Sequence, residues 1–337
     1  MRKVFLLSLL VLSACASQPP KTEEASQPVP SKGFDAELTK FDYPFPVSFY
    51  SFRAQNQDLK MAYMDVAPDK GSDKVIVLLH GKNFSGYYFE DMAKILVGKG
   101  YRVIMIDQIG FGKSTKPALF QYSLHGLASY AKMLLDNLKI TKFQLVGHSM
   151  GGMLAARYAL MYPENVTKLF MIDPLGLEDW KTLTTYKSVD QLYDQELSNN
   201  IDKVKKYQLE YYYDGKWKPE YDKYLVPAQG WFEGPDSQRL AFTSALTSEA
   251  IFTQPVYYEF KNLKMPTVLV IGTKDKTAIG KAWAPEENKM KMGNYPKMAK
   301  DVISKIKKGK LIQLEGMGHT PFIENPEKFW KALTPHL

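Results

Sequence analysis

The chain contains 337 residues, of which 45% are hydrophobic and 24% are charged. This is the composition of a globular protein and excludes a disordered, collagenous or coiled-coil chain. The 44 lysines and arginines exceed the 36 acidic residues by a formal net charge of +8, a modest excess that does not indicate nucleic-acid binding. Cys15 is the only cysteine, which excludes disulfides within the chain and cysteine-based metal clusters.

Residues 1–14 have the features of a signal peptide. Arg2 and Lys3 precede an apolar run over 4–12, which is too short to span a bilayer as a permanent helix. Small residues follow the run, as they do at signal-peptide cleavage sites. We therefore predict that residues 1–14 are removed from the mature protein.

The leader ends in Leu12-Ser13-Ala14-Cys15, which resembles the lipobox of bacterial lipoproteins. This resemblance implies that Cys15 is lipidated and becomes the mature N-terminus, anchored in the cell envelope by two or more acyl chains. The next residue is Ala16 rather than aspartate, which by the same resemblance implies the outer membrane, facing the periplasm. The alternative is ordinary cleavage after Ala16, which would release a soluble periplasmic or secreted protein.

The stretch 16–33 is rich in Pro, Ser, Gln and charged residues and has no apolar periodicity, which is typical of a flexible linker. We predict the lipidated cysteine and a flexible tether over 15–40, and a folded body that begins at residue 41.

The body alternates apolar strands with amphipathic helices. The predicted strands cover 47–52, 59–67, 75–80, 101–107, 143–147, 168–173, 266–272 and 310–315. The first two resemble an antiparallel hairpin, and the last six are nearly continuous apolar runs, as in parallel strands covered on both faces. Helices are predicted at 88–98, 124–138 and 150–161. This order predicts a doubly wound α/β core over 41–174 and 263–337.

Two segments depart from this alternation. The stretch 175–262 is rich in Tyr and Trp and shows weak helical patterns without a strong strand, so we predict a helical cap inserted between the sixth and seventh strands. The long connection 276–309 has seven lysines between Lys289 and Lys308 and is interpreted as a solvated basic face. The alternative is a flap that contacts anionic lipid headgroups.

A G-x-S-x-G motif, Gly147-His148-Ser149-Met150-Gly151, lies between a predicted strand and a predicted helix. A tight turn there projects the Ser149 hydroxyl from the sheet edge, and side chains at 147 and 151 would collide with the neighbouring strand and helix. The N-terminus of the following helix suits a developing oxyanion. Ser149 is therefore a candidate nucleophile, and the alternative is a serine that only caps the helix.

A serine nucleophile needs a base and an acid. The chain has five histidines: His80, His125, His148, His319 and His336. His319 follows the last strand in a glycine-rich loop that can place its imidazole over the sheet edge, so it is the preferred base. Asp275 follows the seventh strand and is the preferred acid because it gives the chain order Ser, Asp, His. Asp173, at the end of the sixth strand, is the alternative acid.

Taken together, these motifs resemble the α/β-hydrolase superfamily over about residues 45–337. The resemblance is carried, in order, by His80-Gly81, the D-x-x-G-x-G-x-S loop 107–114, the motif 147–151, and Gly318-His319 with Pro321, Glu324 and Pro326 behind it. It implies a mostly parallel eight-stranded sheet with helices on both faces and a helical cap. Within the superfamily, the chain is similar to lipase, esterase and lactonase-type serine hydrolases.

The same resemblance implies that the backbone N–H groups of Met150 and Lys82 hold the oxyanion, with Asn83 as second choice for Lys82. The Lys82 side chain is expected to reach solvent, and the alternative is that it binds an anionic group of the substrate.

The expected function is hydrolysis of a carboxylic ester, thioester or lactone of an apolar or aromatic small molecule through an acyl-enzyme. Serine at position 149 argues against the superfamily branches whose nucleophile is aspartate, the epoxide hydrolases and haloalkane dehalogenases. The alternatives are C–C bond hydrolysis or perhydrolysis with the same three residues, or a non-catalytic envelope-binding protein. No metal-ligand pattern, phosphate-binding loop or dinucleotide fingerprint is present, so no cofactor is expected. The sequence specifies neither the natural substrate nor the oligomeric state.

Overall fold

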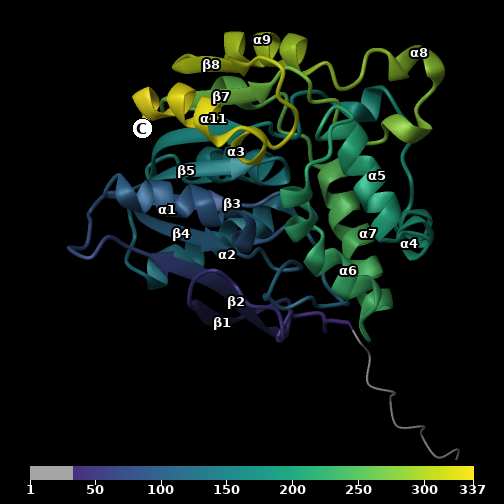
Figure 1. Cartoon of the computed structure of the whole chain (residues 1–337), viewed down its shortest axis with the longest axis horizontal. Coiled ribbons are helices and arrows are strands. Elements are labelled where there is room, and N and C mark those ends of the chain that lie inside the picture. The colour runs from purple at the N-terminus through teal and green to yellow at the C-terminus, as the bar shows by residue number, and fades with distance from the viewer. Residues whose placement is uncertain (1–32) are drawn as a thin grey trace, which may run out of the picture. The chain divides into compact units, whose positions relative to one another are not determined.

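The computed structural model describes residues 33–337 (Figure 1). The predicted signal peptide, Cys15 and most of the predicted tether lie outside the described residues. Within the described part, no helix is both long enough and apolar enough to cross a membrane.

One eight-stranded sheet organises the described chain, in the order β1-β2-β4-β3-β5-β6-β7-β8. Its strands are β1 Val47–Ala54, β2 Gln57–Val66, β3 Val75–Leu79, β4 Arg102–Ile106, β5 Phe143–His148, β6 Val166–Ile172, β7 Thr267–Gly272 and β8 Gly309–Leu314. The pairs β1–β2 and β2–β4 are antiparallel and the other pairs are parallel. The predicted strands and the predicted hairpin are confirmed, with bounds that shift by a few residues.

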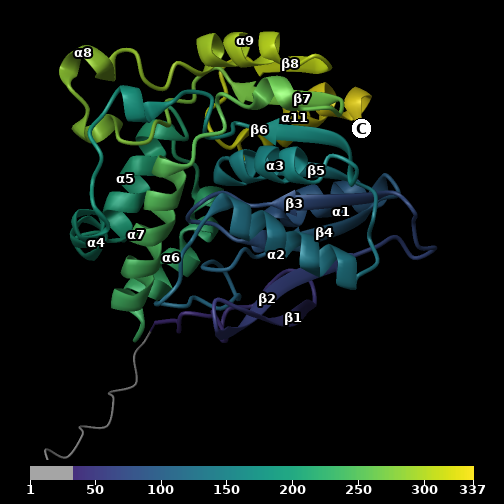
Figure 2. The same ribbon diagram turned by 180° about the vertical axis from the view of Figure 1, so that it is seen from behind.

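Helices cover both faces of the sheet because side chains alternate along each strand. In β3, for example, Val77 and Leu79 join the apolar core on one face, whereas Ile76 and Leu78 join the core on the other. The first face is covered by α2 Leu124–Asn137, α3 Met150–Met161 and α9 Tyr295–Lys305, and Figure 2 views α2 and α3 from this side. The second face is covered by α1 Glu90–Gly98 and α11 Pro326–Leu333, which lie in front of the sheet in Figure 1.

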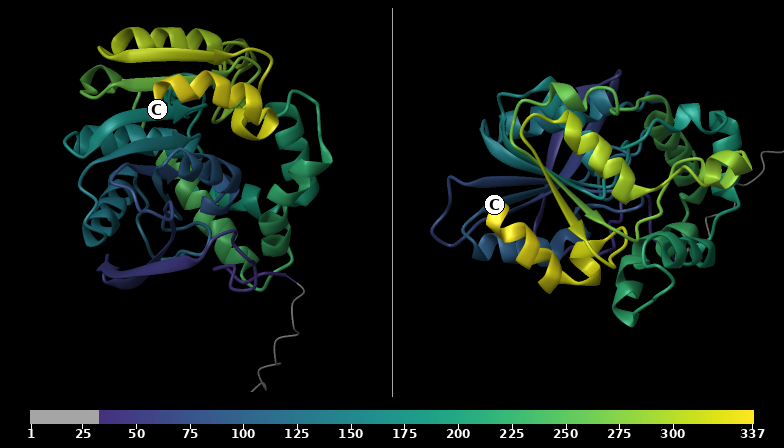
Figure 3. Two further views of the ribbon diagram at one scale, coloured as in Figure 1. Left: turned by 60° about the vertical axis from the view of Figure 1, so that its left-hand side comes forward. Right: turned by 90° about the horizontal axis from the view of Figure 1, so that it is seen from above.

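The segment between β6 and β7 is helical, as predicted. Its α-helices are α4 Val189–Leu197, α5 Ile201–Tyr211, α6 Val226–Phe232 and α7 Ser237–Thr253. These helices gather beyond one end of the strands, beside the sheet rather than on its faces (Figures 1 and 3). We call residues 175–262 the helical insertion.

The connection between β7 and β8 has two different parts. The first, around the short helix α8 Glu286–Lys289, packs against neighbouring segments: the Trp283 indole donates a hydrogen bond of 2.9 Å to Thr185 O, and Gly293 N–H donates one of 3.1 Å to Glu178. The second part, α9, buries Tyr295, Ala299 and Val302 against the sheet. The lysine-rich connection is therefore a covering helix preceded by a packed loop.

The folded body begins earlier than residue 41, so the predicted tether is too long at its C-terminal end. Ala36 and Leu38 are buried, and Phe34 N–H donates a hydrogen bond of 2.7 Å to Gly230 O of α6. Glycine is needed at 230 and 234 because a Cβ there would lie 2.1 Å from the Phe34 ring and 1.9 Å from Phe34 O, respectively. A short segment with few apolar residues shows no periodicity, so the sequence does not reveal this contact.

Replacing Leu38 with alanine tests whether residues 33–40 belong to the core. Leu38 is fully buried, so Leu38→Ala is expected to lower the free energy of unfolding by about 2–5 kcal/mol, measured by urea denaturation. Lys40→Ala, at an exposed position in the same segment, is the control and should change this free energy by less than about 0.5 kcal/mol. Equal effects of the two substitutions would contradict the packing of this segment.

Candidate active site

Ser149 lies in a strained turn between β5 and α3. Its φ of 56° and ψ of −122° fall outside the regions that non-glycine residues prefer, and such a conformation costs on the order of 1–3 kcal/mol. The turn requires glycine on both sides: a Cβ at 147 would lie 2.0 Å from Gly151 O, and one at 151 would lie 2.0 Å from Leu79 O. The predicted steric need for both glycines is therefore confirmed. Met150 is the first residue of α3, so helix geometry leaves its N–H without a partner within the helix.

His319 and Asp275 form a buried hydrogen-bonded pair. His319 Nδ1 lies 2.6 Å from Asp275 Oδ2, and both side chains are 0% exposed. The other oxygen, Asp275 Oδ1, accepts a hydrogen bond of 2.8 Å from Thr277 N–H. Because the carboxylate accepts from Nδ1–H, the lone pair of a neutral His319 is on Nε2. Nε2 is buried and has no hydrogen-bond partner among the described residues, so it is available to take up a proton.

His148, the residue before Ser149, ties the serine turn to the loops that carry His319 and Gly81. His148 Nε2 lies 2.7 Å from His319 O, which can only accept, so Nε2 carries the hydrogen. His148 Nδ1 then accepts from the Tyr88 hydroxyl at 2.8 Å, and that hydroxyl accepts from Gly81 N–H at 3.1 Å. Burial is the main reason that the pKa of His148 lies well below its usual range, which keeps the ring neutral for these roles. His148 thus holds loops rather than facing the reaction.

The structure brings Asp275, and not Asp173, to His319. Asp173 Oδ1 accepts a hydrogen bond of 2.8 Å from Gly272 N–H, and Oδ2 has no hydrogen-bond partner within residues 33–337. Burial, followed by the neighbouring charge of Asp275, raises the pKa of Asp173 well above its usual range. The raised pKa favours the protonated form of Asp173 beside Asp275.

The loop after β3 lies against the serine turn. A Cβ at Gly81 would be 3.0 Å from Ser149 Cβ, so the backbone there approaches Ser149 closely. His80 stabilises the loop: its Nδ1 lies 2.8 Å from Gly81 O, and its Nε2 accepts a hydrogen bond of 3.1 Å from Gln108 N–H. Lys82 and Asn83 follow, and Asn83 has a positive φ of 71°.

The expectation that the Lys82 side chain reaches solvent is wrong. Its side chain is only 15% exposed, and Nζ donates a hydrogen bond of 2.7 Å to Ser244 Oγ of α7. Nζ also lies 3.5 Å from Glu196 Oε1 of α4. These partners are 162 and 114 residues away in the chain, which is why the local sequence pattern does not reveal them.

Two residues that position the histidine loop were not assigned a role from the sequence. Both Glu324 oxygens accept from Gly318 N–H at 3.0 Å, and Oε1 accepts from Thr320 N–H at 3.2 Å. Burial raises the pKa of Glu324 to about 7. Tyr212, from the helical insertion, accepts a hydrogen bond of 3.0 Å from His319 N–H, and its ring centroid lies 4.4 Å from that of His319. The sequence places Glu324 in the motif that follows His319. It gives no reason to choose Tyr212 from among the many tyrosines of the insertion.

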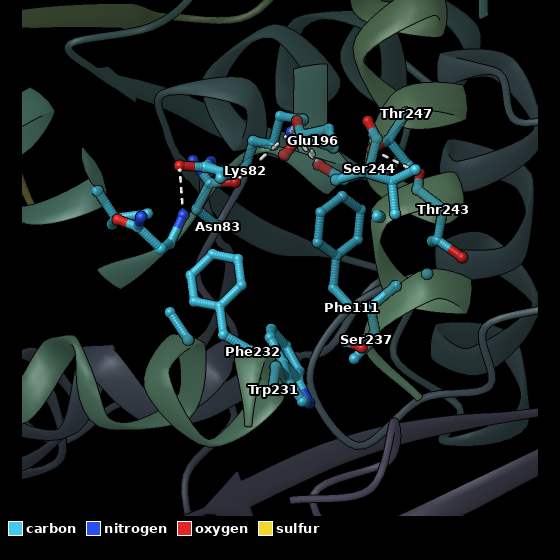
Figure 4. A pocket seen from close by; sticks show the side chains of 18 of the residues that line it. Lys82, Asn83, Phe111, Glu196, Trp231, Phe232, Ser237, Thr243, Ser244 and Thr247 are labelled. Atoms are coloured by element: carbon cyan, nitrogen blue, oxygen red, sulfur yellow. Dashed lines mark hydrogen bonds and ion pairs between the residues drawn. The ribbon is translucent and has the colours of Figure 1, made fainter. Parts of the chain in front are cut away.

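Two cavities border the helical insertion, with volumes of about 380 Å³ and about 280 Å³. The larger faces the loops after β3 and β4, and the smaller faces residues 278–283 after β7. Lys82 and Glu196 line both of them, and Figure 4 shows these side chains with the walls of the larger cavity. Ser149 is 5% exposed and is not among the residues that line either cavity. In the part of the chain that the structure describes, no group of three or more His, Cys, Asp or Glu residues could hold a metal ion.

Comparison with curated proteins finds hydrolases. A 2-hydroxy-6-oxononadienedioate/2-hydroxy-6-oxononatrienedioate hydrolase from Pseudomonas sp. is 40% identical over 103 residues, which are 30% of this chain and 36% of that protein. The chain spans only 36% to 39% of the length of the hydrolases of this kind that it matches. The putative carbamate hydrolase RutD from Pantoea ananatis is 24% identical over 277 residues, 80% of this chain and 90% of that protein.

Comparison with solved structures and families covers more of the chain. The crystal structure of a probable hydrolytic enzyme from Pseudomonas aeruginosa has a TM-score of 0.89 and 45% sequence identity, and the match covers 90% of this chain and 98% of that one. The profile of the alpha/beta hydrolase fold family matches residues 74–326, which include Ser149, Asp275 and His319. With this coverage and with the sheet order described above, the chain belongs to the alpha/beta hydrolase fold family.

Proposed function

We propose that this protein is a serine hydrolase that cleaves a carboxylic ester, thioester or lactone of an apolar or aromatic small molecule. The observation that carries the proposal is the buried pair of His319 and Asp275, which leaves His319 Nε2 without a partner in the described chain. Ser149 stands at the strained turn tied to the same loop through His148. A hydroxyl, an imidazole and a carboxylate in this order are the components of acyl transfer.

The reaction begins when Ser149 Oγ attacks the carbonyl carbon and its proton passes to His319 Nε2. Asp275 stabilises the resulting imidazolium. The oxyanion accepts hydrogen bonds from the N–H groups of Met150 and of Lys82, with Asn83 as the second choice, and each such donor typically contributes about 2.7–4 kcal/mol.

The tetrahedral intermediate then expels the alcohol, thiol or ring oxygen, which takes the proton from His319. Water enters, gives a proton to Nε2 and attacks the acyl-enzyme. Collapse of the second intermediate releases the acid and returns the proton to Ser149. The chain's own side chains supply every proton transfer in this cycle.

Hydrolysis of C–C bonds in oxo acids is the second candidate. It is favoured by the 40% identity to the Pseudomonas hydrolase, whose named substrates are oxo acids rather than esters. Such substrates are anionic and call for a cation at the site. Lys82 follows Gly81, which packs against Ser149, but its ammonium is already hydrogen-bonded to Ser244 and paired with Glu196. The ester, thioester and lactone class therefore remains the primary proposal.

We also propose that Cys15 is lipidated and anchors the protein in the bacterial envelope, at the outer membrane facing the periplasm. The support comes from the sequence around Cys15, which lies outside the described residues. The 17 positions between Cys15 and Gly33 would form the linker to the folded body, which begins against α6.

Replacing Ser149 with alanine is expected to lower kcat on p-nitrophenyl esters by several orders of magnitude, about 10⁴-fold or more, because no other hydroxyl can form the acyl-enzyme. The variant should also lose labelling by a fluorophosphonate probe while keeping its circular dichroism spectrum. Ser304→Ala, at an exposed serine of α9, is the matched control and should keep both properties. Substantial turnover by Ser149→Ala would refute the assignment.

The same substitution, aspartate to asparagine, made at each candidate acid distinguishes Asp275 from Asp173. Asp275→Asn replaces the acceptor of His319 Nδ1–H and is expected to lower kcat by about 10⁴-fold. Asp173→Asn should lower kcat by less than about tenfold, because an amide is isosteric with the protonated carboxyl that the raised pKa favours. Ester-hydrolysis kinetics at pH 8 measure both, and the reverse order of effects would make Asp173 the acid.

The anchor is tested by fractionating bacterial cells that produce the full-length chain. The wild type should sediment with membranes, and Cys15→Ser, which has no thiol to acylate, should appear in the soluble fraction. Ser13→Ala, which alters the leader but keeps the cysteine, is the control and should remain with the membranes. Membrane sedimentation of Cys15→Ser would rule out lipidation as the anchor.

A further inference from the structure

A polar bridge between the core and the helical insertion lies where the two cavities adjoin, because Lys82 and Glu196 line both. The Lys82 ammonium donates to Ser244 Oγ at 2.7 Å, and the Ser244 hydroxyl donates to Glu196 Oε1 at 2.8 Å. Lys82 Nζ and Glu196 Oε1 also lie 3.5 Å apart, with side chains 15% and 23% exposed. We call these three side chains the bridge; in Figure 4 it closes one end of the larger cavity, opposite Trp231 and Phe232.

The residues of α7 change from one cavity to the other within about one turn of the bridge. Ala241, Ser244 and Thr247 line the larger cavity, and Ser248 lines the smaller one. Residues three and four apart follow one another along the same face of a helix, so this face passes from the larger cavity, past the bridge residue Ser244, into the smaller cavity.

Helix α4 repeats the arrangement. Leu192, one turn before Glu196, lines the smaller cavity, whereas Leu197, directly after it, lines the larger one. Glu196 itself lines both. On both helices, therefore, the lining changes from one cavity to the other close to the bridge.

Both cavities have walls suited to apolar groups. Aromatic rings of Phe111, Trp231 and Phe232 line the larger cavity, and Ile251, Phe252 and Trp283 line the smaller one. A methylene chain that crossed from one to the other would have to desolvate the Lys82–Glu196 pair without replacing its hydrogen bonds, which is unfavourable. An apolar group that enters one cavity thus stays on that side.

The bridge begins next to the nucleophile. Lys82 follows Gly81, whose backbone packs against Ser149. From this geometry we infer that Lys82 is a specificity-determining residue, which directs the two arms of the substrate into separate cavities on either side of the scissile carbonyl. The inference rests on the proposed function and deepens it: the substrate class is an acyclic ester or thioester with an apolar group on both the acyl side and the leaving-group side.

The experiment uses two series of esters, one with acyl chains of increasing length on a constant alcohol, and one with alcohols of increasing length on a constant acyl group. Ala241→Trp fills the larger cavity and Ser248→Trp fills the smaller one; both are partly exposed positions of the same helix, so each variant is the matched control of the other. Each tryptophan is expected to lower kcat/KM for the long members of one series by about tenfold or more relative to the other series, and the two variants should affect opposite series.

Lys82 is tested by adding Lys82→Met to each tryptophan variant. Methionine removes the ammonium but keeps an apolar chain, so the cavities join and each tryptophan should then affect both series. Lys82→Arg, which keeps the charge and donors, should preserve the separation. Leucine in place of tryptophan at 241 and 248 provides smaller blocks if a tryptophan variant does not fold. The inference would be overturned if, with Lys82 present, Ala241→Trp and Ser248→Trp lowered kcat/KM equally for both ester series. It would also be overturned if neither variant changed kcat/KM for either series.

Labelling of Ser149 by a small fluorophosphonate distinguishes this failure from failure of the proposed function. If the wild type is labelled and the blocks do not separate the series, the division by Lys82 is wrong and the serine hydrolase assignment stands. If the folded wild type is not labelled and hydrolyses neither series, the proposed function is wrong and the inference falls with it.

Discussion

The geometry of the site depends on one neutral, fully buried histidine that is not expected to react. His148 accepts a hydrogen bond from the Tyr88 hydroxyl and donates one to the backbone carbonyl of His319. The Tyr88 hydroxyl in turn accepts a hydrogen bond from Gly81 N–H. The loops after β3, β5 and β8 are thereby tied together by three consecutive hydrogen bonds in a buried region. A buried polar group that loses its partner costs about 1–3 kcal/mol, so displacement of any one loop is penalised through the other two. Protonation of His148 would remove its acceptor, and burial, which lowers its pKa, prevents that change near neutral pH.

Much of the site could be predicted because its requirements are local. The turn at Ser149 needs glycines at 147 and 151 for steric reasons contained within five residues and one neighbouring strand, so the motif is visible in the sequence. The parallel strands are equally visible, because burial on both faces demands continuous apolar runs. The choice between Asp275 and Asp173 is different in kind. Both follow strands at the same edge of the sheet, and only the direction of each carboxylate, toward His319 or toward Gly272 N–H, separates them.

What the sequence does not reveal is how distant segments meet the helical insertion. A lysine without an obvious partner is reasonably expected in water, because burying an unpaired ammonium is costly. Lys82 avoids that cost with two partners on α4 and α7, neither of which lies near it in the chain. The same reason applies to residues 33–40, whose packing depends on two glycines near α6 that look like ordinary flexible positions. In each case the decisive partner is more than 100 residues away, beyond the reach of periodicity or local motifs.

The helical insertion contacts both halves of the site, but through contacts of different kinds. Tyr212 accepts from His319 N–H and packs its ring against the imidazole, so this contact supports the base directly. The bridge at Lys82 is partly exposed and made of side chains alone, and hydrogen bonds to charged groups of this kind contribute about 1.5–3 kcal/mol. Of the two contacts, the bridge is therefore the one that side-chain rotation can open without disturbing His319. A change at the bridge can therefore alter the cavities, while the geometry that performs the chemistry stays fixed by His148 and Tyr212.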